Sequence, residues 1–343
     1  MKMEPNIVKV AAVQAAPAWI DLKAGVEKTI KLIDEAGAQG VQLIVFPETW
    51  LPGYPWQIWM GPPAFAIHYF GAYMQNSIVA GSDEEKAICN AARRNKIHVQ
   101  MGVSERISGS LYIAQWHINA EGEVISRRKK LKPTHVERSV FGEGDGSDII
   151  VNDTELGKIG GLCCWEHFQP LSKYAMFAQG EQIHCAAWPA FSLYDKLTHG
   201  FSAEVNTNVN QTYAMEGQVF VIQSCAVISQ EIYDELVTSE QQQKFMEVGG
   251  GYSRIWGPDG ATLGENLAPT EEGLVVAEID LSRILLAKVA HDPAGHYSRA
   301  DALALVHNKK PLKPVLTPSE AGQVMRDASE NAEPETDAEI AAQ

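Results

Sequence analysis

The sequence predicts an α/β sandwich built on a mixed β-sheet. Three observations indicate it: short apolar runs typical of buried strands, stretches with helical spacing between some of these runs, and turn sequences that join antiparallel neighbours. Helix-linked strands favour parallel pairing, whereas hairpins require antiparallel pairing. A purely parallel, doubly wound sheet therefore fits the sequence less well.

The strands are expected where apolar residues form short runs bounded by polar or turn residues. NAEGE at 119–123 and GPDGA at 257–261 are hairpin turn signals. The runs that we interpret as strands cover residues 7–14, 41–46, 97–105, 111–119, 158–164, 182–188, 218–227, 251–257 and 274–280.

Three helices are expected between these runs. The first covers residues 21–40, where apolar residues recur every three or four positions, and has Asp21 as its candidate N-cap. The second opens on Ser82, three residues before Glu85, which is the capping-box spacing. The third covers residues 200–218.

Size and charge exclude several classes of protein. The 343 residues, of which 45% are apolar, are enough for one large domain or two ordinary ones. With 43 acidic against 28 basic residues the net charge is −15, and such a surface repels nucleic-acid phosphates. No apolar run is long enough to span a membrane, and Glu4 and Pro5 interrupt the N-terminus where a signal peptide needs an apolar region. We therefore expect a cytoplasmic protein with neither nucleic-acid nor membrane partners.

The cysteines and histidines show no metal-site pattern. Five cysteines, an odd number without an export signal, favour reduced thiols. None stands in a CxxC or Cys/His pattern with the spacing of a zinc site, so we expect no bound metal. Five histidines also lack ligand spacing, and we interpret them as structural: His167, His184, His199, His291 and His296.

The composition changes towards the C-terminus. From Thr317 onwards the chain has seven acidic residues, one basic residue and no aromatic residue. Such a segment cannot bury enough apolar surface to fold alone. We expect one catalytic domain over residues 1–307 and an acidic, solubilising extension over residues 308–343, disordered from about residue 317.

The stretch KIGGLCCWEHFQP, residues 158–170, puts Cys164 where a buried strand ends and a helix begins. The free N–H groups and the dipole of a helix N-terminus stabilise a thiolate, so Cys164 is a candidate nucleophile. Adjacent Cys163 would face the other side of the strand. The alternative interpretation is that Cys164 is simply a small buried residue.

Two further motifs carry groups that could act on such a thiol. Glu48 follows the apolar run at 43–47. Partial burial would raise its pKa and make it a base, although an exposed loop glutamate is the alternative. The four basic residues at 127–130 could supply a fixed positive charge to a developing anion, or could form a solvated strand edge.

Taken together, these motifs resemble those of the nitrilase superfamily, whose members carry a Glu–Lys–Cys triad. Glu48 in FPETW, Lys130 in RRKKLKPT and Cys164 in CCWE match the triad, and Glu137 in THVER matches a second glutamate beside it. The resemblance runs from residue 8 to about residue 306. It implies a four-layer α-β-β-α sandwich and an enzyme that hydrolyses a carbon–nitrogen bond without a cofactor.

Within that superfamily the chain resembles the true nitrilases, and among them the bacterial arylacetonitrilases. The markers are FPETWLPGYPWQIW, KLKPTHVERSVFGEGDG and CCWEHFQPLSKYAMFAQGEQIHCAAWPAF. Gln57 departs from the pattern, because many relatives have an aromatic residue there. The residues expected to bind substrate are Tyr54, Trp165, His135, Trp188 and Phe191. The alternative for each of the aromatic residues is that it packs in the core, and the alternative for His135 is a structural hydrogen bond.

The resemblance also implies a mechanism. Glu48 takes the Cys164 proton, the thiolate attacks a nitrile carbon, and Lys130 stabilises the negative charge that develops on nitrogen. A thioimidate and then a thioester release ammonia and a carboxylic acid, with some amide if the sulfur leaves first. Glu137 would hold Lys130 in register.

Other functions share parts of this pattern. An amidase or a cyanide-hydrolysing relative would have the same triad, and a scaffold or filament protein that lost catalysis is a third alternative. The family further implies a homodimer as the building block, which true nitrilases often extend into helical filaments.

Overall fold

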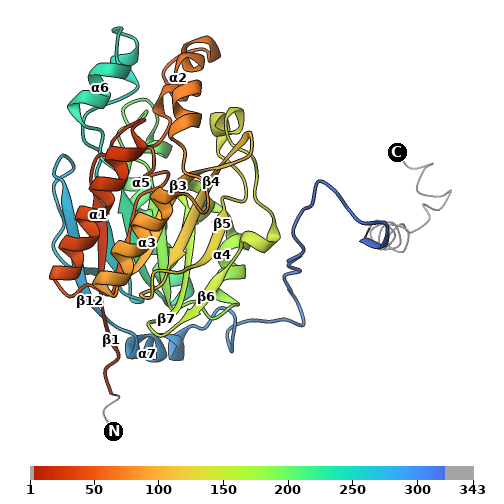
Figure 1. Cartoon of the computed structure of the whole chain (residues 1–343). Coiled ribbons are helices and arrows are strands. Elements are labelled where there is room, and N and C mark those ends of the chain that lie inside the picture. Colours follow the sequence, from red (N-terminus) through yellow and green to blue (C-terminus); the bar gives the residue numbers. More distant parts are fainter. Residues whose placement is uncertain (1–3, 321–343) are drawn as a thin grey trace. The chain divides into compact units, whose positions relative to one another are not determined.

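The computed structural model describes residues 4–320 of the chain. The strands form two six-stranded sheets, and each has a core of three parallel strands with antiparallel neighbours (Figure 1). The first sheet has the order β12 (Gly273–Asp280), β1 (Ile7–Gln14), β2 (Leu43–Val45), β3 (His98–Ile107), β4 (Ser110–Ile118) and β5 (Val124–Lys129). The second has the order β11 (Thr262–Leu263), β10 (Arg254–Trp256), β9 (Phe220–Cys225), β8 (Ile183–Trp188), β7 (Gly157–Cys163) and β6 (Val151–Thr154).

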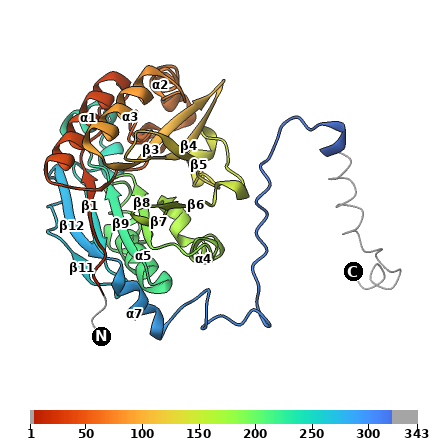
Figure 2. The same cartoon turned by 60° about the horizontal axis from the view of Figure 1, so that its bottom comes forward.

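Four layers follow from how these sheets are covered. The sheets pack face to face through apolar side chains of β1 and β2 on one side and β7 to β10 on the other. Helices α1 (Leu22–Ala38) and α3 (Asp83–Asn95) cover the outer face of the first sheet, and α4 (Pro170–Phe177) and α5 (Ala203–Gly217) that of the second. Figure 2 shows the layers in this order. The expected α-β-β-α sandwich and its mixed sheets are confirmed.

Two of the predicted helix starts are confirmed, and the third helix, expected from residue 200, begins at Ala203. Asp21 accepts the N–H of Ala24 at 2.9 Å, and Ser82 accepts that of Glu85 at 3.3 Å. The capping box is different from the one expected, because the Glu85 carboxylate accepts the N–H of Gly81 and not that of Ser82.

Several elements were not expected from the sequence. They are the strands β5, β6 and β11 and the helices α2 (Pro63–Asn76), α6 (Gln230–Leu236) and α7 (Ser282–Ala290). The expected helix start at Cys164 is wrong in one respect. The chain first forms a 3₁₀ helix, η4 (Cys164–Phe168), and α4 begins only at Pro170, where a proline fits the first helical turn.

Contacts divide the chain into two units, Met1–Lys309 and Lys310–Gln343. In the second unit, within residues 310–320, Lys313 pairs with Glu320 at 2.8 Å. Most of the stretch predicted to be disordered, residues 321–343, lies outside the described residues. The domain boundary at residue 307 stays a prediction. None of the helices within residues 4–320 is both long and apolar enough to cross a membrane.

The segment that follows β2 runs alongside β3. The N–H of Phe46 donates to Gln100 O at 2.9 Å, and the N–H of Ser104 donates to Leu51 O at 2.7 Å. Between these two points Gly102 faces the loop so closely that a Cβ there would stand 1.9 Å from Pro47 O. The glycine is therefore required for close approach of two backbones.

We predict that Gly102→Ala destabilises the protein by about 1–3 kcal/mol, because the added methyl group forces the 46–51 loop away from β3. Urea denaturation measures the change. Gly71→Ala in α2 is the control, since a Cβ there meets open space and should leave the stability unchanged or higher. A Gly102→Ala variant with wild-type unfolding free energy contradicts this account.

Candidate active site

Three strand ends supply the expected triad. Glu48 lies three residues after β2, Lys130 directly follows β5, and Cys164 directly follows β7. The Lys130 ammonium donates to Glu48 Oε1 and to Glu137 Oε2, both at 2.8 Å, and all three side chains are fully buried. The structure therefore brings Glu48, Lys130 and Glu137 into one ion cluster inside the protein.

Burial sets the charges in this cluster. Burial alone would lower the pKa of Lys130, but the carboxylates of Glu137 and Glu48 outweigh it and hold that pKa well above its usual value. Burial raises the pKa of Glu48, and the neighbouring ammonium only partly offsets this. Within the part of the chain that the structure describes, Glu48 Oε2 has no hydrogen-bond partner. Glu48 is thus a carboxylate with one free oxygen and an increased affinity for a proton.

Unlike Glu48, Glu137 has both carboxylate oxygens engaged in hydrogen bonds. It lies in the 3₁₀ helix η2 (His135–Ser139), where its Oε2 accepts the N–H of Thr134 at 2.6 Å in a capping box. Its Oε1 accepts the hydroxyl of Tyr54 at 2.7 Å, and that hydroxyl accepts the indole N–H of Trp59 at 3.0 Å. Both oxygens are therefore engaged, which suits a group that holds Lys130 in place.

Cys164 occupies a sharp turn at the end of β7. Its φ of +50° lies in the left-handed region, which costs a non-glycine residue on the order of 1 kcal/mol. Burial raises the pKa of the thiol well above its usual value, the charge on Glu48 adds to this, and Lys130 and the N–H of Trp165 oppose it. The thiol is therefore protonated at rest and needs a base.

The neighbouring Cys163 does not line the cavity at this site, and its sulfur accepts a hydrogen bond from Arg128 at 3.8 Å. It is completely buried and belongs to a different apolar cluster, with Tyr73 and Phe141 among its members, whereas Cys164 packs with residues of the second sheet and its helices. All five cysteines are free thiols.

A second buried ion pair, which the sequence did not reveal, joins the lysine strand to the cysteine turn. Arg128 donates to both oxygens of Glu166, at 2.8 and 3.0 Å. The same carboxylate accepts the N–H of Cys163 and the N–H of Leu131, both at 2.8 Å. Glu166 thereby fixes the residue after Lys130 relative to the residue before Cys164.

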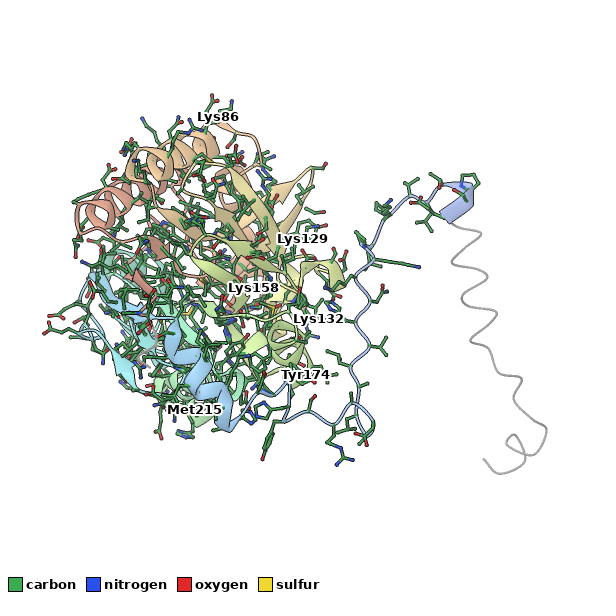
Figure 3. All side chains as sticks on the ribbon, turned by 90° about the horizontal axis from the view of Figure 1, so that it is seen from below. Lys86, Lys129, Lys132, Lys158, Tyr174 and Met215 are labelled. Carbon is green, nitrogen blue, oxygen red and sulfur yellow. The ribbon has the colours of Figure 1, made fainter. Side chains whose placement is uncertain are left out.

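The alternation of side chains along β5 could have indicated that Arg128 is buried. It lies two residues before Lys130, so both side chains point to the same face, and both are buried. On the other face of the strand, Arg127 is exposed and Lys129, labelled in Figure 3, is half-buried. The basic stretch is thus a solvated edge on one face and a buried charge array on the other.

Aromatic side chains form the walls of a cavity at this site. Four of the five residues expected to bind substrate line it, and His135 does not. His135 lines the adjacent cavity, which shares Trp165 with this one, and stacks on Trp59 at a ring distance of 5.6 Å. The lining residues are Tyr54, Trp56, Trp59, Thr134, Glu137, Cys164, Trp165, Trp188, Pro189, Ala190, Phe191, Leu193, Phe201 and Asn206.

Gln57, the departure from the family pattern, is fully buried and does not line this cavity. Neither its amide oxygen nor its amide nitrogen has a partner among the described residues.

Comparisons with known proteins identify the family of this chain. Residues 9–288 match the carbon–nitrogen hydrolase family. The chain is 51% identical to a nitrilase of Pseudomonas syringae pv. syringae over 89% of this chain and 90% of that one, and 50% identical to an arylacetone-specific nitrilase of Alcaligenes faecalis over 88% and 85%. It is also 44% identical to an arylacetonitrilase of Aspergillus niger over 87% and 88%.

Solved structures show the same fold. A carbon–nitrogen hydrolase from Helicobacter pylori superposes with a TM-score of 0.69 at 18% identity, covering 86% of this chain and 96% of that one. Nit3 of Saccharomyces cerevisiae, a member of branch 10 of the nitrilase superfamily, gives a TM-score of 0.65 at 19% identity over 85% and 96%. The protein belongs to the carbon–nitrogen hydrolase family.

Proposed function

We propose that Cys164, Glu48, Lys130 and Glu137 carry out the nitrile hydrolysis of this enzyme, and that its substrate is an arylacetonitrile or another aromatic or arylaliphatic nitrile. The observation that carries the proposal is the buried ammonium of Lys130 between two carboxylates, at a cavity that Cys164 lines. Relatives named as nitrilases and arylacetonitrilases support the reaction and the substrate class.

The first half of the reaction forms a covalent intermediate. Glu48 accepts the thiol proton on its free oxygen, and the Cys164 sulfur attacks the nitrile carbon. Negative charge develops on the nitrile nitrogen, and the Lys130 ammonium and the Trp165 N–H stabilise it in a site from which water is largely excluded. Glu48 then passes the proton to this nitrogen, which completes the thioimidate and restores the carboxylate as a base.

The second half consumes two water molecules. The first adds to the thioimidate carbon, with Glu48 as the base, and loss of ammonia leaves a thioester. The second hydrolyses the thioester to the carboxylic acid and restores the Cys164 thiol. If the first tetrahedral intermediate expels sulfur in place of ammonia, the product is the amide.

The substrate class follows from the cavity walls. Tyr54, Trp165, Trp188 and Phe191 present aromatic surface next to Cys164, and aromatic rings pack well in offset or edge-to-face contact with an aryl substrate. His135 stays a prediction as a substrate contact, because it lines the neighbouring cavity.

We predict that Cys164→Ala lowers ammonia release from phenylacetonitrile by about 10⁴-fold or more, since the nucleophile is lost. Cys163→Ala is the matched control and should keep most of the activity, because Cys163 packs away from the cavity. Wild-type ammonia release by Cys164→Ala would remove the proposed nucleophile and with it the proposed role of the triad.

A substrate panel tests the substrate class. We expect the kcat/KM for phenylacetonitrile to exceed that for a short aliphatic nitrile by about 10-fold or more, because the aromatic walls contribute only to the larger substrate. Phenylacetamide and cyanide are assayed alongside. A higher kcat/KM for the amide or for cyanide would favour the amidase or cyanide-hydrolysing alternative.

The quaternary structure and the compartment are part of the proposal. A homodimer that assembles further into larger oligomers or helical filaments is supported by the apolar face of α7, where Leu285, Leu286 and Val289 are 65–74% exposed. A cytoplasmic location is supported by the free thiols.

Light scattering and electron microscopy test the assembly. We predict a particle of at least twice the mass of one chain, because solvent exposure of such an apolar face is unfavourable. A monomer at micromolar concentration would contradict it.

A further inference from the structure

Behind the nucleophile lies a buried polar chain that the proposed reaction does not use. Tyr213 of α5 donates its hydroxyl to Glu181 Oε2 at 2.6 Å, and Glu181 Oε1 lies 2.7 Å from His184 Nδ1. The Nε2 atoms of His184 and His167 are 2.9 Å apart, and His167 Nδ1 lies 2.6 Å from the carbonyl oxygen of Cys164. Each of these side chains is at most 1% exposed. An unbroken series of contacts thus runs from Glu181 to the backbone of the nucleophile.

The chemistry of these groups determines where the protons lie. A carbonyl oxygen only accepts, so His167 Nδ1 must carry a hydrogen. If His167 is neutral, its Nε2 accepts, and the Nε2 of His184 must donate. The Nδ1 of His184 then accepts from a protonated Glu181, unless His184 is itself a cation beside a Glu181 carboxylate.

The chain therefore needs one proton more than its ordinary neutral-pH groups provide. Its three hydrogen bonds, from Glu181 to the carbonyl of Cys164, require three protons. A carboxylate and two neutral imidazoles hold only two. Any arrangement that makes all three bonds includes one additional proton and carries no net charge, whichever of the three side chains holds that proton.

The end of the chain is coupled to the reacting atoms through one peptide group. The carbonyl of Cys164 and the N–H of Trp165 belong to the same rigid, planar unit and point in opposite directions. The Trp165 N–H acts on the Cys164 thiol, whose pKa it lowers, and it is the backbone donor that stabilises charge in the proposed reaction. Fixing the carbonyl of Cys164 fixes the direction of that N–H.

We propose that Glu181, His184 and His167 are positioning residues that share one proton and, through it, hold the Cys164–Trp165 peptide with its N–H aimed at the reacting sulfur and nitrogen. The proposal rests on the proposed role of Cys164 as the nucleophile. The left-handed φ of Cys164 supports it, because a turn in this unfavourable conformation requires an external contact to persist.

The Glu181 carboxyl group packs directly against the backbone of β7 at Gly160. A Cβ on Gly160 of β7 would stand 2.1 Å from Glu181 Oε1, so this glycine makes room for the carboxyl group.

Within residues 4–320 no three His, Cys, Asp or Glu side chains are arranged to hold a metal ion, and the two histidines are engaged with each other and with their neighbours.

The surroundings favour a neutral carboxylic acid at the far end. Burial raises the pKa of Glu181 to about 8, and the Tyr213 hydroxyl only partly offsets this. Burial lowers the pKa of both His184 and His167 well below the usual value, so the shared proton rests on the carboxyl group. The other charged or titratable groups that act on the chain are the Arg128–Glu166 pair, Lys173, Glu216 and Cys185.

The pH dependence follows with a definite sign. Because the pKa of Glu181 in the folded protein lies above its ordinary value, the proton is present below pH 8 and is lost as the pH rises through about 8. One of the three hydrogen bonds then breaks. When both imidazoles shift their hydrogens towards the Glu181 carboxylate, the bond that is lost is the one to the carbonyl of Cys164, and the Cys164–Trp165 peptide is released. Activity should fall on this alkaline side.

Two variants of Glu181 distinguish a positioning role, which needs its hydrogen bonds, from a purely structural role, which needs only its volume. Glu181→Gln imitates the protonated acid, since its amide donates to His184 and its oxygen accepts from Tyr213. Glu181→Met fills similar space without either bond. At pH 7 we expect kcat within about threefold of wild type for Glu181→Gln and about 10–100-fold lower for Glu181→Met, with KM unchanged in both.

The pH profile gives a second readout. The fall in kcat above about pH 8 should be absent in Glu181→Gln or shifted to higher pH, because an amide cannot lose this proton. Glu105→Gln is the matched control. Glu105 is also buried, accepts from Trp116 and has a pKa raised by burial, but lies in the first sheet, so its replacement should leave the alkaline fall in place.

The outcomes distinguish this inference from the proposed function. Equal losses of kcat in Glu181→Gln and Glu181→Met, or wild-type kcat in Glu181→Met, would overturn the positioning role while Cys164→Ala stays inactive. If Glu181→Met does not fold, the pH profile decides: no alkaline fall in the wild type, or the same fall in Glu181→Gln, overturns it. Activity in Cys164→Ala would instead overturn the proposed function.

Discussion

A lysine ammonium without water around it is the constraint on which this active site depends. An isolated charge in a protein interior is too costly to persist, so Lys130 requires carboxylates at hydrogen-bond distance. Glu48 and Glu137 provide them, each 2.8 Å away. These two carboxylates come from segments that are distant in the sequence, and the sandwich must bring them together. The cluster therefore ties the loop after β2 to the end of β5, in the same place where the chemistry needs a base and a cation.

The same requirement explains the second ion pair. Once the end of β5 is committed to Lys130, its position relative to the cysteine turn must also be fixed, because a displacement of about 1 Å is enough to reduce catalysis strongly. Glu166 does this by accepting N–H groups from both segments while Arg128 neutralises it. Arg128 holds the pKa of Glu166 below its usual range in spite of burial, so this link stays ionised throughout the neutral range.

Much of the fold could be predicted from the sequence, and so could the positions of Glu48, Lys130 and Cys164 at strand ends, because strand ends and family motifs are local signals. What could not be predicted depends on pairing across the sheet. β5 was missed because its buried position carries Arg128 in place of an apolar residue, and the buried residue that directly follows the strand is Lys130, so the usual apolar alternation is absent. His167 and His184 are 17 residues apart, and only the parallel pairing of β7 with β8 makes them neighbours. Histidines at such a distance have no recognisable spacing in one sequence.

Cys164, the proposed nucleophile, therefore lies between two buried polar systems with different proposed roles. The Lys130 cluster is charged, and its value lies in the field it exerts on the thiol and on the anion that follows. The Glu181 chain has no net charge when fully bonded, so it can hold the backbone of Cys164 without adding to the negative potential that already opposes thiolate formation. A carboxylate in place of the neutral acid would add to that potential. The neutral Glu181 chain holds the backbone in position, and the charged Lys130 cluster provides the electrostatic field. The direction of the Trp165 N–H can therefore be fixed without making the thiol harder to ionise.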